Sequence, residues 1–430
     1  MRVPFPAMSS LATALCLLCL ALPAAARAGN VLAPWADGRS APEDLQVSLV
    51  TFGPGDDVPS WFGHTALVVE DRRLKEERLY NYGMFDFDKF ARFALGRLEF
   101  WVGEAPVGPT YRMYAWLDRD VRVQVLNLRP AAAARLARAL ADNIRPESRD
   151  YLYHHYNDNC STRPRDKIDQ AVGGQLRRAL DIPGRYTLRD HTRRYAAVSA
   201  PMAVLLDFLM NDEIDRPIRK WDEAFLPAEL EAQVRAFTYV DETGATVPLL
   251  ASEQVLYAAK NRAPVAAEPP PLAPWLLGVG TLLGAAAVGL VLAGGTRRPR
   301  TRMALGILSA VQGLLFGVPG LVLALLWAVT NHTVTFHNED LFLANPLTFA
   351  ALPLGWMLAR GSERARAWLP RVWMGLAALG LLGVALKALP AFDQDSWRLV
   401  GLMMPATLGM AAGLWLDGRR EPALAPAPRV

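Results

Sequence analysis

The residue in this chain best suited to covalent chemistry is Cys160. The other two cysteines, Cys16 and Cys19, lie in an apolar N-terminal segment that reads as a cleaved export signal. An exported protein that keeps one thiol has no partner for a disulfide, so reactivity is the reason to retain it. A free cysteine can also be a small hydrophobic core residue, but the surrounding segment, residues 157–166, is strongly polar. We therefore interpret Cys160 as a nucleophile.

A histidine upstream could serve as its base. His64 follows Trp61-Phe62-Gly63 and opens an apolar, β-branched run that continues to Val69. In a strand, alternate residues share a face, so His64 projects from the same row as Ala66 and Val68. A thiol and a strand-borne imidazole are the components of thiol nucleophilic catalysis. A purely structural role for His64 is the alternative.

A third catalytic group could orient the imidazole. Asn81 lies on the neighbouring predicted strand, within Tyr80-Asn81-Tyr82-Gly83, although an asparagine near a strand end can also be a turn residue. Trp61 is a candidate for the apolar wall of a lipid groove or, alternatively, for the core.

Further polar residues are predicted to bind substrate. Arg163 follows the cysteine, and its alternative role is an ion pair with Asp166. His332 and His337 lie in a polar loop, residues 331–340, between two apolar segments, where they could hold a headgroup. The alternative for both is an ordinary solvated loop.

The thiol is expected at the start of a helix. Ser161 or Cys160 can act as the N-cap, Pro164 falls near the first turn, and apolar Ile168 and Val172 follow at i, i+4. A helix N-terminus carries partial positive charge and free N–H groups. We therefore expect the helix to lower the thiol pKa and its N–H groups to hold an oxyanion.

The soluble part of the chain is predicted to be an α+β domain, because strand patterns dominate its first half and helix patterns its second. The expected strands are Leu45–Phe52, His64–Asp71, Arg78–Met84, Leu98–Val102 and Arg119–Leu128. The expected helices are Ala131–Asn143, a segment from near Cys160 to about Val172, Pro201–Met210 and Ala228–Phe237.

The two ends of the chain indicate export and membrane insertion. Residues 1–28 form a signal peptide with a small-x-small site at Ala26-Arg27-Ala28. Apolar stretches of spanning length follow the proline-rich linker 258–271. The expected catalytic domain is 29–257, the membrane domain 272–416 and the tail 417–430. The five predicted spans are Leu272–Gly294, Met303–Thr330, Leu341–Ala359, Val372–Leu389 and Leu399–Leu416.

Loop charges orient the spans. The connections 296–302 and 360–371 each hold four arginines, whereas 331–340 has no lysine or arginine and 390–396 carries only two aspartates. By the positive-inside rule the arginine-rich loops are cytoplasmic. The chain is therefore predicted to be a multi-pass protein of the bacterial inner membrane, with a periplasmic N-terminal domain and a cytoplasmic C-terminus.

Several function classes are not indicated. The net charge of +4 reflects arginines at the inner membrane face and requires no nucleic-acid partner. The chain has no Walker loop, dinucleotide fingerprint or zinc-ligand spacing, so we expect neither a cofactor nor a metal. The predicted partner is a lipid or lipoprotein substrate in the membrane, and the oligomeric state is left open.

The order of the two catalytic candidates is informative. Papain-like enzymes place the nucleophile on an earlier helix and the histidine on a later strand, and here the order is reversed. This resembles the circularly permuted papain-like group, whose members similar to lecithin:retinol acyltransferase handle acyl chains. The segments 62–66, 80–87 and 156–166, with five C-terminal spans, resemble the Lnb-type lipoprotein transacylases.

The resemblance implies a specific reaction. It implies transfer of an acyl chain from the diacylglyceryl group of a lipoprotein to the amine of its N-terminal cysteine, with Cys160 and His64 carrying the chemistry. From the residues alone, the alternatives are a cysteine peptidase or amidase acting on cell-wall peptide and a non-enzymatic membrane sensor or scaffold.

Overall fold

The computed structural model describes residues 32–85 and 95–419. The predicted signal peptide and residues 420–430 of the predicted tail lie outside these ranges. The described chain forms two compact units. The first, the N-terminal unit, comprises residues 32–85, 97–185 and 217–264, and the second, the membrane unit, comprises residues 95–96, 186–216 and 265–419.

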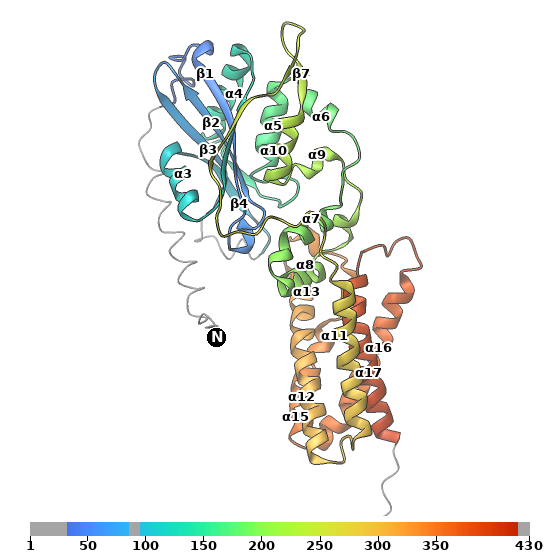
Figure 1. Ribbon diagram of the computed structural model, residues 1–430. Coiled ribbons are helices and arrows are strands. Elements are labelled where there is room, and N and C mark those ends of the chain that lie inside the picture. The colour runs from blue at the N-terminus through green and yellow to red at the C-terminus, as the bar shows by residue number, and fades with distance from the viewer. Residues whose placement is uncertain (1–31, 86–94, 420–430) are drawn as a thin grey trace, which may run out of the picture. The chain divides into compact units, whose positions relative to one another are not determined.

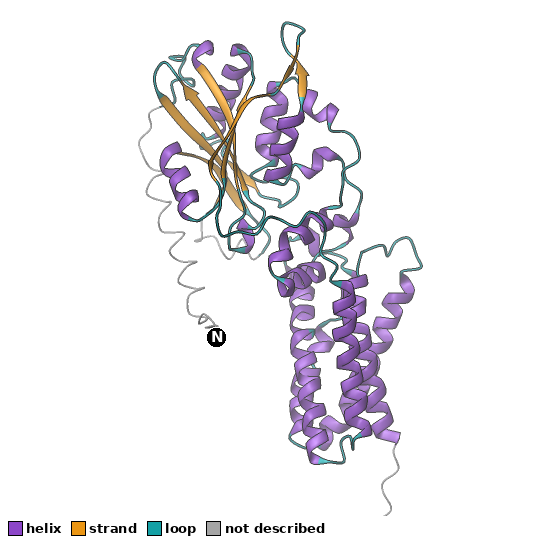
Figure 2. Ribbon diagram, viewed as in Figure 1, coloured by secondary structure: helices purple, strands orange, loops and turns teal. Residues whose placement is uncertain are grey.

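The N-terminal unit is built on an antiparallel seven-stranded sheet with the order β6-β4-β3-β2-β1-β5-β9. A separate hairpin pairs β7 with β8 (Figure 2). The strands are β1 (Leu45–Phe52), β2 (His64–Asp71), β3 (Glu76–Met84), β4 (Glu99–Ala105), β5 (Val121–Leu126), β6 (Asp150–Leu152), β7 (Thr238–Val240), β8 (Thr246–Pro248) and β9 (Leu250–Tyr257).

Helices cover both faces of the sheet (Figure 1). Side chains alternate between the two faces of β1. Leu49 packs on one face in a large core with α4, α5 and α10, and Phe52 packs on the other face in a smaller core with Tyr114 of α3. Burying both faces explains why β1 and β2 are almost continuously apolar. The helices of this unit are η2 (Pro42–Asp44), η3 (Val58–Ser60), α3 (Val107–Trp116), α4 (Pro130–Asn143), α5 (Thr162–Ala171), α6 (Gln175–Ala179), α9 (Lys220–Glu223) and α10 (Pro227–Ala236).

The N-terminal domain is thus mixed α and β, as predicted. Strands β1 and β2 have the predicted bounds, and every predicted helix is present within a few residues. Helix α3 and strand β9 were not predicted. The exposed strand β9 lacks a clear alternation of apolar and polar residues, and α3 begins with Val-Gly-Pro, which is a poor helix start in sequence.

The membrane unit is a bundle of apolar helices. Three of its helices, and the stretch Pro299–Val329 formed by two more, are long and apolar enough to cross a bilayer. A bent pair, Thr333–Phe342 with Pro346–Ala359, is a fifth such segment when its two parts are counted as one span. The predicted span Leu341–Ala359 is therefore not one straight helix, since it begins at the end of the first member of this pair and the two members meet at 60°. The helices are α11 (Ala273–Leu292), α12 (Pro299–Leu315), α13 (Gly317–Val329), η7 (Thr333–Thr335), η8 (Glu339–Phe342), α14 (Pro346–Phe349), α15 (Ala351–Ala359), α16 (Glu363–Leu386) and α17 (Trp397–Arg419).

Small residues bring two of these helices together. A Cβ on Gly409 of α17 would lie 2.3 Å from the Cα of Gly284 of α11, and a Cβ on Gly280 would lie 2.2 Å from the carbonyl oxygen of Leu402. No side chain fits at those distances. Glycine therefore allows the backbones of α11 and α17 to touch, as in other membrane helix pairs.

A polar segment from the middle of the chain belongs to the membrane unit. Residues 186–216 carry α7 (Leu188–Tyr195), η5 (Ala196–Val198), α8 (Ala200–Leu209) and η6 (Asp212–Asp215). Buried Arg193 pairs with Asp207 at 2.8 Å and with Asp395 at 2.6 Å. Asn211 donates from its backbone N–H to the carbonyl oxygen of Val334 at 2.7 Å. These contacts attach the segment to the loops that precede α14 and α17, although by sequence it lies within the range predicted for the catalytic domain.

Candidate active site

Cys160 lies immediately before α5, whose N-cap is Ser161. The side chain of Asn159 holds this turn. Its Oδ1 accepts from the backbone N–H of Ser161 at 2.8 Å and of Thr162 at 2.9 Å, and its Nδ2 donates to the carbonyl oxygens of His155 and Phe225. The thiol is therefore fixed by a buried asparagine that ties the start of α5 to the loop before α10.

This arrangement corrects one expectation about the oxyanion. The first N–H groups of α5 were predicted to be free, but Asn159 occupies those of Ser161 and Thr162, and its carbonyl oxygen accepts from Arg163 N–H at 3.3 Å. Two backbone N–H groups remain beside the sulfur, those of Cys160 itself and of Thr65, and both favour the thiolate. The N–H donors available to an oxyanion thus come from the turn before α5 (Cys160) and from β2 (Thr65).

His64 begins β2, directly after Gly63. Gly63 has φ +82, and a Cβ there would lie 2.9 Å from the carbonyl oxygen of Phe52, so only glycine makes this entry into the strand without strain. The imidazole ring is nearly parallel to Phe52 and to Tyr114, with centroids 6.1 and 6.2 Å away. These contacts fix the plane of the ring.

Asn81 fixes which ring nitrogen carries the proton. The Nε2 of His64 lies 2.6 Å from the Oδ1 of Asn81, whose Nδ2 points to the sulfur of Met84 at 3.3 Å. Because an amide oxygen only accepts hydrogen bonds, we infer that Nε2 is protonated and that Nδ1 keeps its lone pair. The free lone pair is what a general base needs.

Gly83 lies close to both Cys160 and His64. A Cβ at Gly83 would lie 3.6 Å from the Cβ of Cys160 and 4.0 Å from the Cε1 of His64. Gly83 has φ +98 and sits where the pairing of β3 with β4 shifts register between Tyr82 and Met84. The irregular strand and the missing side chain leave room for the two groups at the same end of the sheet.

Burial sets the charge state of the pair. Burial raises the pKa of the Cys160 thiol to about 11, although the Thr65 N–H and the charge of Arg119 oppose it. Burial likewise lowers the pKa of His64 to about 4, although the hydrogen bond to Asn81 raises it in part. The prediction that the helix lowers the thiol pKa is therefore wrong, because desolvation exceeds the effect of the N–H groups. Both groups are therefore neutral at pH 7, and Cys160 is half-buried.

Arg119 was not predicted to belong to this site. The residue is 8% exposed, its guanidinium lies 4.8 Å from the centroid of the Tyr114 ring, and its Nε donates to the carbonyl oxygen of Gly53 at 2.7 Å. Its charge influences both Cys160 and His64. In sequence it is one arginine between two aspartates, so nothing there distinguishes it from a solvated residue.

The structure gives the predicted substrate residues other partners. Trp61 is buried and donates its indole N–H to the carbonyl oxygen of Asp56 at 3.1 Å, which favours a core role. Arg163 forms a two-pronged ion pair with Asp158 and stacks 3.6 Å from the centroid of the Tyr151 ring. The suggested partner of Arg163, Asp166, pairs instead with Arg165.

The two loop histidines belong to the membrane unit. His332 is half-buried ahead of η7, and exposed His337 has φ +51 with its ring against Trp327, 5.4 Å between centroids. The side chain of Asn211 holds this loop through the carbonyl oxygens of Thr333 and Phe336. The substrate role predicted for both histidines remains a prediction.

The histidines next to Cys160 have structural partners. The Nδ1 of His154 accepts from the backbone N–H groups of Tyr156 and Asn157. The ring of His155 meets Phe62 edge to face, 4.5 Å between centroids. Within residues 32–85 and 95–419, no cluster of three or more histidine, cysteine or acidic side chains is arranged to hold a metal ion.

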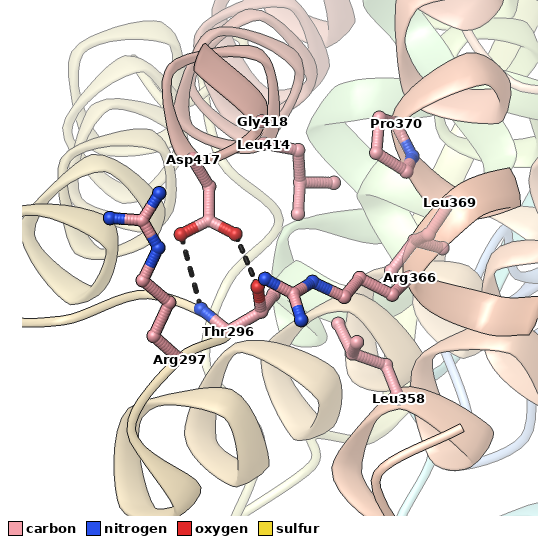
Figure 3. A pocket seen from close by; sticks show the side chains of 9 residues that line it. All are labelled: Thr296, Arg297, Leu358, Arg366, Leu369, Pro370, Leu414, Asp417 and Gly418. Atoms are coloured by element: carbon pink, nitrogen blue, oxygen red, sulfur yellow. Dashed lines mark hydrogen bonds between the residues drawn. The ribbon is translucent and has the colours of Figure 1, made fainter. Parts of the chain in front are cut away.

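A cavity of about 290 Å³ lies elsewhere, at the arginine-rich end of the membrane unit (Figure 3). Buried Asp417 of α17 accepts from the hydroxyl and the backbone N–H of Thr296 at 2.5 and 3.2 Å, which closes the α11–α12 loop onto α17. The remaining lining residues are Arg297, Leu358, Arg366, Leu369, Pro370, Leu414 and Gly418.

Comparison with known proteins gives two matches to family models. The model described as the Lnb N-terminal periplasmic domain matches residues 32–194, and the model of the Lnb transmembrane domain matches residues 275–391. The first match contains Cys160, His64, Asn81 and Arg119. Neither the curated proteins nor the solved structures compared with the chain gave a match.

Proposed function

Because the chain belongs to the Lnb family of multi-pass membrane proteins, we propose that it is an acyltransferase with a cysteine nucleophile. The acyl donor would be the ester of a membrane lipid or of a lipoprotein diacylglyceryl group, and the acceptor the N-terminal amine of a lipoprotein. The observation that carries this proposal is the grouping of Cys160, His64 and Asn81 around Gly83.

The first step acylates the enzyme. The thiol proton moves to Nδ1 of His64 while Sγ of Cys160 attacks the ester carbonyl carbon. The resulting oxyanion accepts hydrogen bonds from the backbone N–H groups of Cys160 and Thr65. The carbon–oxygen bond of the ester then breaks, and the departing glycerol oxygen takes the proton from His64. A thioester and a lyso-lipid are the products.

The second step transfers the acyl group. The acceptor amine attacks the thioester carbon, the carbon–sulfur bond breaks, and an amide forms. His64 takes the amine proton and returns it to the sulfur, so the enzyme is restored without an oxidant or cofactor. Since His64 is neutral above its pKa of about 4, it can act as the base in both steps at neutral pH.

The fold is consistent with a permuted papain-like domain. A cysteine at a helix start, a histidine on a strand and an asparagine beside its far nitrogen are the three elements of that catalytic arrangement, and the order of His64 before Cys160 is the permuted one. We further propose that the arginine-rich loops and the C-terminus are cytoplasmic, because the predicted outer loops lack lysine and arginine.

The test of this function is direct detection of the thioester. Full-length protein in detergent is incubated with a diacylated lipopeptide and measured by intact-protein mass spectrometry for a hydroxylamine-sensitive acyl adduct on Cys160. Cys160→Ala should form no adduct and make no N-acylated product, and Cys160→Ser should be strongly impaired because a hydroxyl is far harder to deprotonate. Full transfer activity in Cys160→Ala would refute the proposal. Cleavage of the peptide without acyl transfer would instead indicate a peptidase.

A further inference from the structure

The cavity at the arginine-rich end of the membrane unit is enclosed by segments that are far apart in the sequence (Figure 3). The α11–α12 loop contributes Thr296 and Arg297, and the other lining residues come from α15, α16 and α17. Arg297, Arg366 and Gly418 are exposed, so the cavity is accessible from the surface. Its volume of about 290 Å³ is close to the lower limit of small-ligand sites, roughly 300–1,000 Å³. The space therefore suits a ligand the size of a lipid headgroup.

The charged and the apolar lining residues are separated along the helix axes. Arg366 lies near the start of α16, and Leu369 follows one turn further into that helix. Asp417 lies near the end of α17, and Leu414 is one turn further in. Leu369 and Leu414 are both buried. The cavity is thus charged at the helix ends and apolar towards the middle of the helices. This polarity matches an amphiphile whose headgroup lies at the membrane surface.

The charged part of the lining favours an anion. Arg297 and Arg366 supply two positive charges and Asp417 one negative charge, so the lining carries a net charge of +1. Both oxygens of Asp417 accept hydrogen bonds from Thr296, which fixes this carboxylate in the cavity wall. Arg366 pairs with exposed Glu363 at 3.8 Å, a long surface contact of little strength. A guanidinium has five N–H donors, so Arg366 can bind an anion as well.

We propose that this cavity binds the phosphate of a glycerophospholipid with a net negative charge, and that the glycerol end of the lipid packs against the buried leucines. Guanidinium groups bind phosphate oxygens through paired N–H donors. Basic pockets between membrane helices hold anionic headgroups in this way. Free phosphate has no apolar part to place against Leu369 and Leu414. The bound lipid is not a reactant, because the cavity lies in the membrane unit and Cys160 belongs to the N-terminal unit.

A lipid in this cavity would connect two segments of the membrane unit. One phosphate that contacts Arg297 and Arg366 together would join the α11–α12 loop to α16. A ligand that binds the folded state and not the unfolded state increases stability. We therefore expect anionic lipid to raise the unfolding temperature of the protein.

The experiment measures lipid binding by the full-length protein. Purified protein in detergent is titrated with phosphatidylglycerol or with phosphatidylcholine of identical acyl chains, and native mass spectrometry counts the bound lipids. We expect one phosphatidylglycerol to bind with at least tenfold higher affinity than phosphatidylcholine. Inorganic phosphate at the same concentration should not displace it, because the leucines contribute to lipid binding alone.

Two arginine variants test the charge. Arg366→Gln should weaken phosphatidylglycerol binding about tenfold, since a charged hydrogen bond is lost, and the additional change Arg297→Gln should weaken it further. Binding of phosphatidylcholine should change less. The matched control is Arg364→Gln, which removes an exposed arginine of the same helix that does not line the cavity. This control should bind phosphatidylglycerol as the wild type does.

A pair of glycine variants tests the location. A Cβ at Gly418, which lines the cavity, meets nothing within 4 Å, so a larger side chain fits there without a clash. Gly418→Leu should therefore occupy part of the cavity and weaken lipid binding at least tenfold. A Cβ at Gly375 of α16 also meets nothing within 4 Å, but Gly375 does not line the cavity. Gly375→Leu should leave binding unchanged.

Three results would overturn the proposal. Equal affinity for the two lipids, or an equal loss in Arg366→Gln and Arg364→Gln, would show that the arginines of the cavity do not select an anion. Displacement of phosphatidylglycerol by inorganic phosphate at equal concentration would indicate a site for free phosphate instead of a lipid. Unchanged binding in Gly418→Leu would place the bound lipid elsewhere on the protein. None of these results bears on acyl transfer by Cys160.

Discussion

The Nε2 of His64 lies 2.6 Å from the Oδ1 of Asn81 across two adjacent strands. The strand register explains the contact, because Asn81 pairs with Ala66, two residues along β2 from His64, and diagonal neighbours on one face are within reach of each other. The sheet therefore sets the tautomer of the imidazole before any substrate binds.

Replacing Asn81 tests this relationship. In Asn81→Ala the imidazole can rotate or protonate on Nδ1, so we expect the rate of Cys160 acylation to fall about tenfold or more. The unfolding temperature should change little, because one partly buried hydrogen bond is worth on the order of 1 kcal/mol. The rate is measured by intact-protein mass spectrometry and stability by thermal unfolding. An unchanged rate would remove Asn81 from the catalytic arrangement.

The raised thiol pKa predicts the pH dependence of alkylation. With the pKa of Cys160 at about 11, the thiolate fraction of the free enzyme should rise roughly tenfold for each pH unit up to that value. Iodoacetamide labelling of Cys160 in the wild-type protein should follow this rise. Labelling that reaches a plateau below pH 8 would show that the thiol is activated in the resting enzyme and contradict the neutral pair.

His64 should make the protein less stable in mild acid. Its pKa is about 4 in the folded state against 6.5 for the free side chain, so the unfolded state binds more protons between these values and stability falls as pH drops from 6.5 to 4. His155 has the same lowered pKa, also because of burial. His64→Gln should therefore remove part of the acid sensitivity, and His64→Gln with His155→Gln more. Chemical denaturation at pH 7 and pH 4.5 measures the difference.

Gly83 and Gly38 form a matched pair for testing whether the space beside Cys160 and His64 is needed for catalysis. Both have positive φ, +98 and +82, but a Cβ at Gly38 meets nothing within 4 Å, whereas one at Gly83 contacts Cys160 and His64. Alanine at either position should cost on the order of 1 kcal/mol through backbone strain. Only Gly83→Ala should also slow acylation of Cys160. Equal acylation rates in the two variants would mean that this space is not used in catalysis.

Reporter fusions test the orientation in the membrane. A periplasmic phosphatase fused after Ala258 should be active, and one fused after Arg420 inactive, because loop arginines alternate across the spans. The bent pair ending at Ala359 makes this informative, since a re-entrant segment instead of a span would leave both ends of the membrane unit on the same side. Active phosphatase at both positions would support that reading.

The sequence by itself determined the chemistry-bearing residues and the local elements around them. Alternation placed His64 at the head of β2, and the run from Ser161 to Val172 marked α5, because strand and helix periodicity are properties of neighbouring residues. Composition likewise located the spans, since each must be apolar over its own length.

Only the tertiary structure decided how these parts act together. The proximity of Cys160 and His64 to Gly83, the capture of the α5 N–H groups by Asn159 and the burial of Arg119 all depend on residues distant in sequence. The raised thiol pKa has the same origin, because desolvation is set by everything that surrounds the sulfur, whereas the effect of the helix terminus can be read locally. The sequence therefore identified which residues could react, and the packing of distant segments decided their charge and their orientation.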